Sequence, residues 1–183
     1  MEKTKSNDTA LLVIDVQVGL IDGLPAYRGG EVLERITELL TAARAAKAPV
    51  IYVQHDGPEG HLLERSTSGW EIHPAISPTE ADVVVRKRAC DAFFETPLRR
   101  ELEERGITNL VVAGAMTQYC VDTACRRAVS LGYDVTLAGD AHTTGDNEIL
   151  KAAQIIAHHN ALLDGFGAGD HVITVKPSRE IVF

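Results

Sequence analysis

Residues 108–131 read Thr108-Asn-Leu-Val-Val-Ala-Gly-Ala-Met-Thr-Gln-Tyr-Cys-Val-Asp-Thr-Ala-Cys-Arg-Arg-Ala-Val-Ser-Leu131. The uninterrupted apolar run from Leu110 to Ala113 is typical of a strand that is buried on both faces of a parallel sheet. From Val121 onward, apolar residues recur at helical spacing and predict an amphipathic helix. The stretch therefore predicts a buried strand, a tight connector over residues 114–119 and a helix.

Cys120 falls at about the first turn of that predicted helix. A thiol in this position feels the positive end of the helix dipole and nearby unpaired backbone N–H groups, which favour the thiolate. Free cysteines are also among the most buried residue types, so packing alone is the alternative explanation. The position by itself makes Cys120 a candidate nucleophile.

The composition is that of an ordinary globular protein, with 45% apolar and 24% charged residues. The length of 183 residues predicts one domain, residues 1–183 with a core over about 10–175. The net charge of -8 argues against a nucleic-acid partner, because no basic face is left to neutralise phosphates. Met1 to Thr9 is polar, and no apolar run approaches roughly 18 residues. We therefore expect a cytoplasmic protein without a membrane partner.

Strand-like and helix-like segments alternate along the chain, mostly with short links. This alternation predicts a three-layer α/β/α domain with a mainly parallel six-stranded sheet. The strands are expected at residues 10–16, 50–54, 82–85, 110–113, 133–138 and 171–175, and the helices at 31–47, 96–105, 121–131 and 147–159.

Asp15, Lys87 and Cys120 each lie at or just past the predicted carboxyl end of a strand. In open parallel sheets, ligands bind outside those ends, where the strand order reverses. An ionised Asp in an apolar run is costly unless it is paired or hydrogen-bonded, although Asp15 can also simply cap the following loop. The three side chains are therefore expected to converge at one edge of the sheet.

A thiol, a carboxylate and a lysine in one partly enclosed site form a workable nucleophilic set. A carboxylate in a poorly solvated pocket can accept the thiol proton, and a nearby lysine stabilises the developing negative charge. Backbone N–H groups of the 114–120 connector are suitably placed for an oxyanion hole. The set predicts acyl transfer from an amide or related carbonyl to water through a thioester, without a cofactor.

Four parts of the chain resemble the isochorismatase-like cysteine hydrolase superfamily in their order and spacing. They are Leu11–Gln17, Val85–Phe93 with Thr96–Leu98, Gly114–Val121 and Tyr133–His142, and the likeness runs over about residues 10–175. The resemblance implies a Rossmann-like fold and a small-molecule substrate. Members typically assemble as dimers or tetramers with partner residues closing the pocket, so we expect a homodimer or homotetramer.

The resemblance also implies a role for each convergent residue: Asp15 as the proton carrier, Lys87 as the charge-stabilising partner and Cys120 as the nucleophile. It implies a cis peptide bond between Ala115 and Met116, which turns the Met116 N–H toward the oxyanion beside that of Cys120. The implied activity is hydrolysis of a small amide, imide or carbamoyl compound.

Five further residues are candidate pocket walls: Gln17, Leu20, Trp70, Phe93 and Tyr119. Trp70 lies in a long connection after the second strand, and connections of that length often act as lids or binding walls. Core packing explains Trp70, Phe93 and Tyr119 nearly as well. Gln17 can hydrogen-bond either the site or the loop backbone.

Nicotinamidases of this superfamily bind a metal through an Asp-x-His motif and a further His after the second strand. Here that place reads Gln54-His55-Asp56-Gly57, with the order wrong and no second close histidine until His61. The three cysteines also lack the paired spacing of a zinc site. We therefore expect neither a metal nor a cofactor, and site roles for His55, His61 and His142 stay open.

Two alternatives to amide hydrolysis stay open. True isochorismatases cleave an enol ether, a reaction that needs an acid but no thiol. A non-catalytic, oligomeric binding protein can use the same scaffold, although it has no physical reason to keep a costly buried charge cluster. The intact set of Asp15, Lys87 and Cys120 favours the amide hydrolase.

Overall fold

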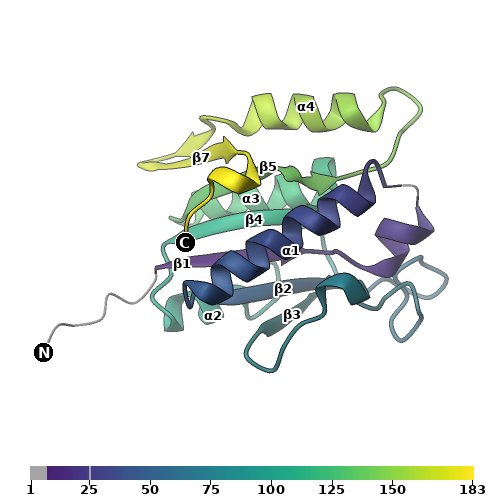
Figure 1. Cartoon of the computed structure of the whole chain (residues 1–183), viewed down its shortest axis with the longest axis horizontal. Helices are drawn as coiled ribbons and strands as arrows, with labels where there is room; N and C mark the ends of the chain where they lie inside the picture. Colours follow the sequence, from purple (N-terminus) through teal and green to yellow (C-terminus); the bar gives the residue numbers. More distant parts are fainter. Residues whose placement is uncertain (1–7, 25) are drawn as a thin grey trace, which may run out of the picture.

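The computed structural model describes residues 8–24 and 26–183 and contains a seven-stranded sheet in the order β3-β2-β1-β4-β5-β7-β6 (Figure 1). Neighbouring strands run parallel except β6 and β7, which pair antiparallel. The strands are β1 (Thr9–Ile14), β2 (Val50–His55), β3 (Val83–Lys87), β4 (Asn109–Ala115), β5 (Asp134–Thr143), β6 (Gly167–Ala168) and β7 (His171–Lys176).

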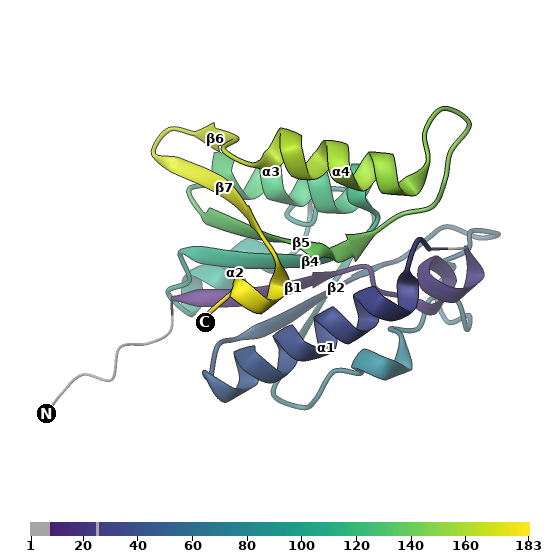
Figure 2. The ribbon, with the colours of Figure 1, turned by 45° about the horizontal axis from the view of Figure 1, so that its top comes forward.

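Helices cover both faces of this sheet (Figure 2). They are α1 (Gly29–Ala45), α2 (Leu98–Glu104), α3 (Asp122–Ser130) and α4 (Ala152–Leu163). Buried side chains of α1 pack on one face, and those of α2, α3 and the end of α4 pack on the other. The predicted three-layer α/β/α class is thereby confirmed. Across the described ranges, no helix has the length and apolarity needed to cross a membrane.

Strand β1 explains why the sheet is buried on both sides. Successive side chains of a strand point to opposite faces. Leu11 and Val13 accordingly join the core beneath α1, whereas Leu12 and Ile14 join the core beneath α2 and α3. All four are fully or almost fully buried, so a continuous apolar run is what a central strand requires.

The sheet has one strand more than predicted, because residues 167–168 pair with β7 as the short strand β6. Helix α4 also starts later than its apolar spacing predicts. The Asn147 side chain accepts hydrogen bonds from the N–H groups of Ile149 and Leu150, at 2.9 and 2.7 Å, and holds a turn there. Ile149, expected on the buried face of a helix, is consequently 88% exposed.

The order of the strands reverses between β1 and β4. The chain leaves β1 for β2 and β3 on one side and then returns to place β4 on the other side of β1. Segments that follow β1 and β4 therefore diverge and leave room between them at the carboxyl edge of the sheet. Asp15 follows β1, and the turn that carries Cys120 follows β4.

Candidate active site

Asp15, Lys87 and Cys120 meet at this edge. Lys87 Nζ lies 2.6 Å from Asp15 Oδ2 and donates a hydrogen bond to Cys120 Sγ at 3.2 Å. The exposed fractions of the three residues are only 1%, 2% and 9%. The convergence expected from the strand ends is therefore present in the structure.

Asp15 occupies a special backbone position. Its N–H donates to the carbonyl of Val53 at 2.9 Å, so it extends the pairing of β1 with β2 by one residue. Its φ of 48° lies in the left-handed region, where a residue other than glycine is strained. Its buried Oδ1 has no hydrogen-bond partner within the described part of the chain. That oxygen is thus free to accept a proton.

The turn that carries Cys120 depends on Gly114. Gly114 has a φ of 130°, and a Cβ at this position would lie 2.0 Å from the carbonyl oxygen of Ile14. Only glycine fits so close to β1. The peptide bond between Ala115 and Met116 is cis, in agreement with the resemblance. The chain then enters a π-helical turn over Thr117–Val121, which leads into α3.

Lys87 is held by several partners besides Asp15. It donates to the carbonyl of Ala89 at 2.9 Å, and His55 Nδ1 lies 3.2 Å from Nζ. Burial lowers the pKa of Lys87, but the charge of Asp15 and the contact with Cys120 Sγ outweigh burial and leave that pKa above its usual value. Burial and the Lys87 charge lower the pKa of His55. The site therefore contains a lysine cation beside a neutral imidazole.

Burial is the strongest influence on the thiol of Cys120. Burial, followed by the negative charge of Asp15, raises the pKa of Cys120, and the opposing effect of Lys87 is smaller. The start of α3 favours a thiolate, but it does not compensate for the lost hydration and the adjacent carboxylate. The resting site accordingly holds an Asp15–Lys87 ion pair beside a protonated thiol.

A cavity of about 270 Å³ opens over Cys120. Leu20 and Tyr119, two of the predicted pocket residues, line it. Gln17, Trp70 and Phe93 do not. Phe93 instead lies in the core, where its ring stacks on Tyr133 with centroids 6.0 Å apart. Its position as a packing residue follows from the apolar environment beneath α2 and α3.

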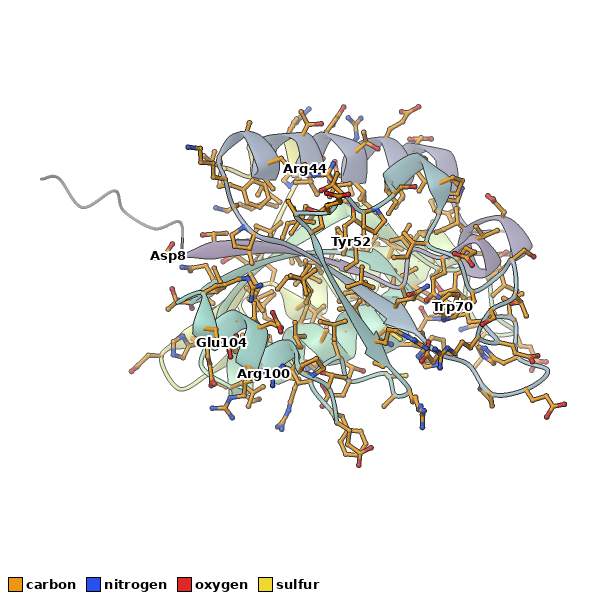
Figure 3. All side chains as sticks on the ribbon, turned by 90° about the horizontal axis from the view of Figure 1, so that it is seen from below. Asp8, Arg44, Tyr52, Trp70, Arg100 and Glu104 are labelled. Carbon is orange, nitrogen blue, oxygen red and sulfur yellow. The ribbon has the colours of Figure 1, made fainter. Side chains whose placement is uncertain are left out.

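Gln17 and Trp70 hold the long connection against the sheet. The Gln17 side chain donates to the carbonyls of His55 and Trp70, at 3.0 and 2.8 Å, and accepts from the His55 N–H at 2.9 Å. Gln54 also donates to the Trp70 carbonyl, at 3.0 Å. In Figure 3, Trp70 lies at the opposite end of the sheet from Asp8, which precedes β1. Both residues therefore position the wall without lining the cavity.

Asp56, next to His55, also serves the connection. Its carboxylate accepts hydrogen bonds from Trp70 Nε1 at 2.8 Å and from Arg86 Nε at 3.1 Å. The Arg86 guanidinium also lies over the Trp70 ring, 5.2 Å from its centroid. Over residues 8–24 and 26–183, no three His, Cys, Asp or Glu side chains gather in a metal-binding group. The absence of a metal stays a prediction.

His142 belongs to a buried chain of hydrogen bonds behind the Cys120 turn. Asn160 Nδ2 donates to the carbonyl of Gly139 at 2.9 Å, which leaves its Oδ1 to accept from His142 Nε2 at 2.8 Å. His142 Nδ1 must then accept from the Thr117 hydroxyl, at 2.9 Å. The chain ties the turn between Met116 and Cys120 to α4. Sequence reasoning missed it because the two segments are far apart in the chain.

His142 makes the folded protein sensitive to mild acid. Burial lowers the pKa of His142 to about 4, from 6.5 when unfolded. Because the unfolded chain binds this proton first, stability is complete above pH 6.5 and falls as the pH drops toward 4. When the pH falls from 7.5 to 5.0, we expect His142 to lower the free energy of unfolding by about 2 kcal/mol, as measured by urea unfolding.

A His142→Gln variant provides the control for this prediction, since its amide can both donate and accept but does not titrate. Its free energy of unfolding is expected to fall about 2 kcal/mol less than the wild type over the same pH interval. Equal losses in the two proteins would show that His142 becomes protonated as easily in the folded chain as in the unfolded one.

Residues 9–164 match the family model described as Isochorismatase domain. The match covers most of the chain, including β1, the ion pair, the cis peptide and the Cys120 turn. The protein therefore belongs to the isochorismatase family, as the sequence motifs predict.

Named relatives agree with this assignment. A streptothricin hydrolase from Streptomyces noursei is 41% identical over 138 residues, covering 75% of this chain and 50% of that protein. A ureidoacrylate amidohydrolase from Pseudomonas syringae is 30% identical, covering 82% of this chain and 77% of that protein. The solved structure of an isochorismatase from Pseudomonas putida has a TM-score of 0.88 at 31% identity, covering 100% of this chain and 94% of that one.

The chain spans about half the length of the streptothricin hydrolases that it matches. Its similarity to hydrolases nevertheless extends over nearly the whole chain in other relatives.

Proposed function

We propose that the protein is a cysteine-dependent hydrolase that cleaves a C–N bond of a small amide, imide or carbamoyl compound through a thioester. The observation that carries this proposal is the contact of Lys87 Nζ with both Asp15 Oδ2 and Cys120 Sγ in a buried site. One named relative is an amidohydrolase and another is a hydrolase of a different compound, and the amidohydrolase supports C–N cleavage as the reaction class.

The first half of the proposed reaction makes the thioester. Asp15 takes the thiol proton as Cys120 Sγ attacks the carbonyl carbon, so the pKa of the thiol does not need to be low beforehand. The N–H groups of Met116 and Cys120 bind the resulting oxyanion, and Lys87 offsets the charge that moves between sulfur and carboxylate. When the C–N bond breaks, Asp15 returns its proton to the departing nitrogen.

The second half regenerates the enzyme. Water attacks the thioester carbon while Asp15 accepts one of its protons, and the C–S bond breaks. The proton then returns to the Cys120 sulfur, and the products are an acid and an amine or ammonia. Every proton that is released is taken up again, so the cycle consumes only water.

Intact-protein mass spectrometry during turnover tests this proposal. A panel of small amides, imides and carbamoyl compounds is incubated with the enzyme and quenched in acid, and release of ammonia or amine is followed in parallel. We expect an acyl adduct on Cys120 that hydroxylamine removes. Cys125→Ala, which changes a buried thiol in the core beneath α3, is the matched control and should still form the adduct.

Three outcomes count against the proposal. If a Cys120→Ala variant still turns over the substrate and forms no adduct, the chemistry needs no thiol, as in enol-ether cleavage. An adduct on Cys90 or Cys125 instead of Cys120 assigns the nucleophile elsewhere. A Cys120→Ala protein that keeps its full biological effect indicates a binding protein.

A further inference from the structure

The cavity over Cys120 has a mostly apolar wall. Its apolar members are supplied by the turn after β1, the long connection after β2 and the Cys120 turn. They are Leu20, Leu24, Leu62, Leu63, Met116 and Tyr119. At about 270 Å³ the cavity lies just below the usual range for small-molecule sites, roughly 300–1,000 Å³. A ligand that fills it must be small and must contact leucine side chains.

The cavity has no unpaired charge among its described lining residues. Asp15 is paired with Lys87 at 2.6 Å, and both are buried. His61 Nδ1 accepts a hydrogen bond from the Leu63 N–H at 3.0 Å, so this nitrogen is already engaged within the loop. Burial and the Lys87 charge also lower the pKa of His55, which keeps its ring neutral. An anion that enters the cavity would therefore gain no positively charged partner from these lining residues.

The arginines near the site face a different cavity. Arg65, Arg86 and Arg88 line a second space of about 410 Å³, together with Asp56 and Lys87. None of the three lines the cavity over Cys120. A carboxylate attached to the substrate would thus lose its hydration in the Cys120 cavity without gaining a guanidinium partner.

From the leucine wall and the internally paired charges, we infer that the substrate is a small, uncharged amide with an apolar substituent, and that anionic analogues are rejected. This inference rests on the proposed function and narrows it. The rejection comes from the missing counter-charge, so a single cation placed in the wall should weaken it. Leu62 suits this purpose because it is 38% exposed and can be changed without opening the core.

Two isosteric amides provide the first arm of the test. 4-Methylpentanamide and succinamate differ mainly in an isopropyl group and a carboxylate of similar shape. We expect kcat/KM for the neutral amide to exceed that for the anion by about 100-fold or more, the ratio typical of a poorly compensated buried charge. Equal values, or a preference for succinamate, would overturn the inference and leave amide hydrolysis intact.

Alkylation of Cys120 provides a second arm that does not need turnover. Iodoacetamide and iodoacetate differ in charge, and their relative rates with glutathione give the intrinsic reactivity. We expect the ratio of the iodoacetamide rate to the iodoacetate rate to be at least about tenfold higher at Cys120 than for glutathione. Peptide mass spectrometry measures the two rates at Cys120. If no amide is hydrolysed but this ratio holds, the proposed function fails and the charge selectivity of the cavity stands.

A matched pair of variants separates charge from shape. Leu62→Arg should lower both neutral-to-anion ratios by about tenfold or more, whereas Leu62→Gln, which is polar but uncharged, should change them far less. Equal effects of the two variants would indicate that the leucine acts through packing rather than through the absence of charge, and would contradict the inference.

Discussion

An Asp15→Asn variant is expected to lose roughly 10²–10⁴-fold in kcat/KM for amide hydrolysis, the usual contribution of a general acid–base residue. The same variant should react faster with iodoacetamide at pH 7.5. The Asp15 charge is one of the causes that raise the pKa of Cys120, and without it Lys87 stabilises the thiolate alone. The alkylation rate should rise about tenfold for each unit by which that pKa falls.

Slower hydrolysis and faster alkylation are opposite effects, so a general loss of structure cannot explain both. Kinetics of ammonia release and time-resolved mass spectrometry of the Cys120 peptide measure them on one protein preparation. Lys87→Met is the comparison, because removal of the cation should slow both reactions. If Asp15→Asn slows alkylation as well as hydrolysis, then Asp15 stabilises the thiolate in the resting site instead of keeping the thiol protonated.

The second large effect concerns stability. Lys87→Met should destabilise the protein by about 3–5 kcal/mol, because it leaves the Asp15 carboxylate buried without its partner. The double variant Asp15→Asn, Lys87→Met should recover much of this loss, since it removes both charges. Urea unfolding at pH 7.5 of the wild type, the two single variants and the double variant gives the four free energies of unfolding that a double-mutant cycle needs.

A loss below about 1 kcal/mol in Lys87→Met would indicate that Asp15 is not charged in the folded protein. The pH dependence gives an independent check. Because the pKa of Lys87 is raised from 10.5 in the fold, the ion pair contributes fully below pH 10.5. That contribution is lost only as the pH rises through the folded-state pKa, and it should be absent from Lys87→Met at every pH.

The convergence of Asp15, Lys87 and Cys120 could be predicted because it follows from topology. Parallel strands end at a common edge, and each residue stands at the end of a strand or just after it. Apolar runs and helical spacing likewise define the layers. The roles of the three residues stay predictions until the variants are measured.

Other features depend on tertiary contacts that no spacing reveals. Neither Gln17 nor Trp70 lines the cavity. The Gln17 side chain bonds the backbone of His55 and Trp70, and the Trp70 indole bonds the Asp56 carboxylate, so the partners of both come from distant segments. Phe93 packs on Tyr133, which lies 40 positions further along the chain. The pKa of Cys120 is likewise raised by burial and by the charge of Asp15. Neither cause can be read from the position of Cys120 near the start of a helix.

The contacts of Gln17 also bear on how the sequence of this protein can change during evolution. Asp15, Lys87 and Cys120 lie at or near strand ends, whereas the leucines that line the cavity belong mainly to two loops, which Gln17 and Asp56 anchor. Substitutions at Leu20, Leu24 or Leu62 can therefore accumulate without disturbing proton transfer. A library randomised at these three positions, with the anchors kept, is the natural starting point for evolving a new substrate range.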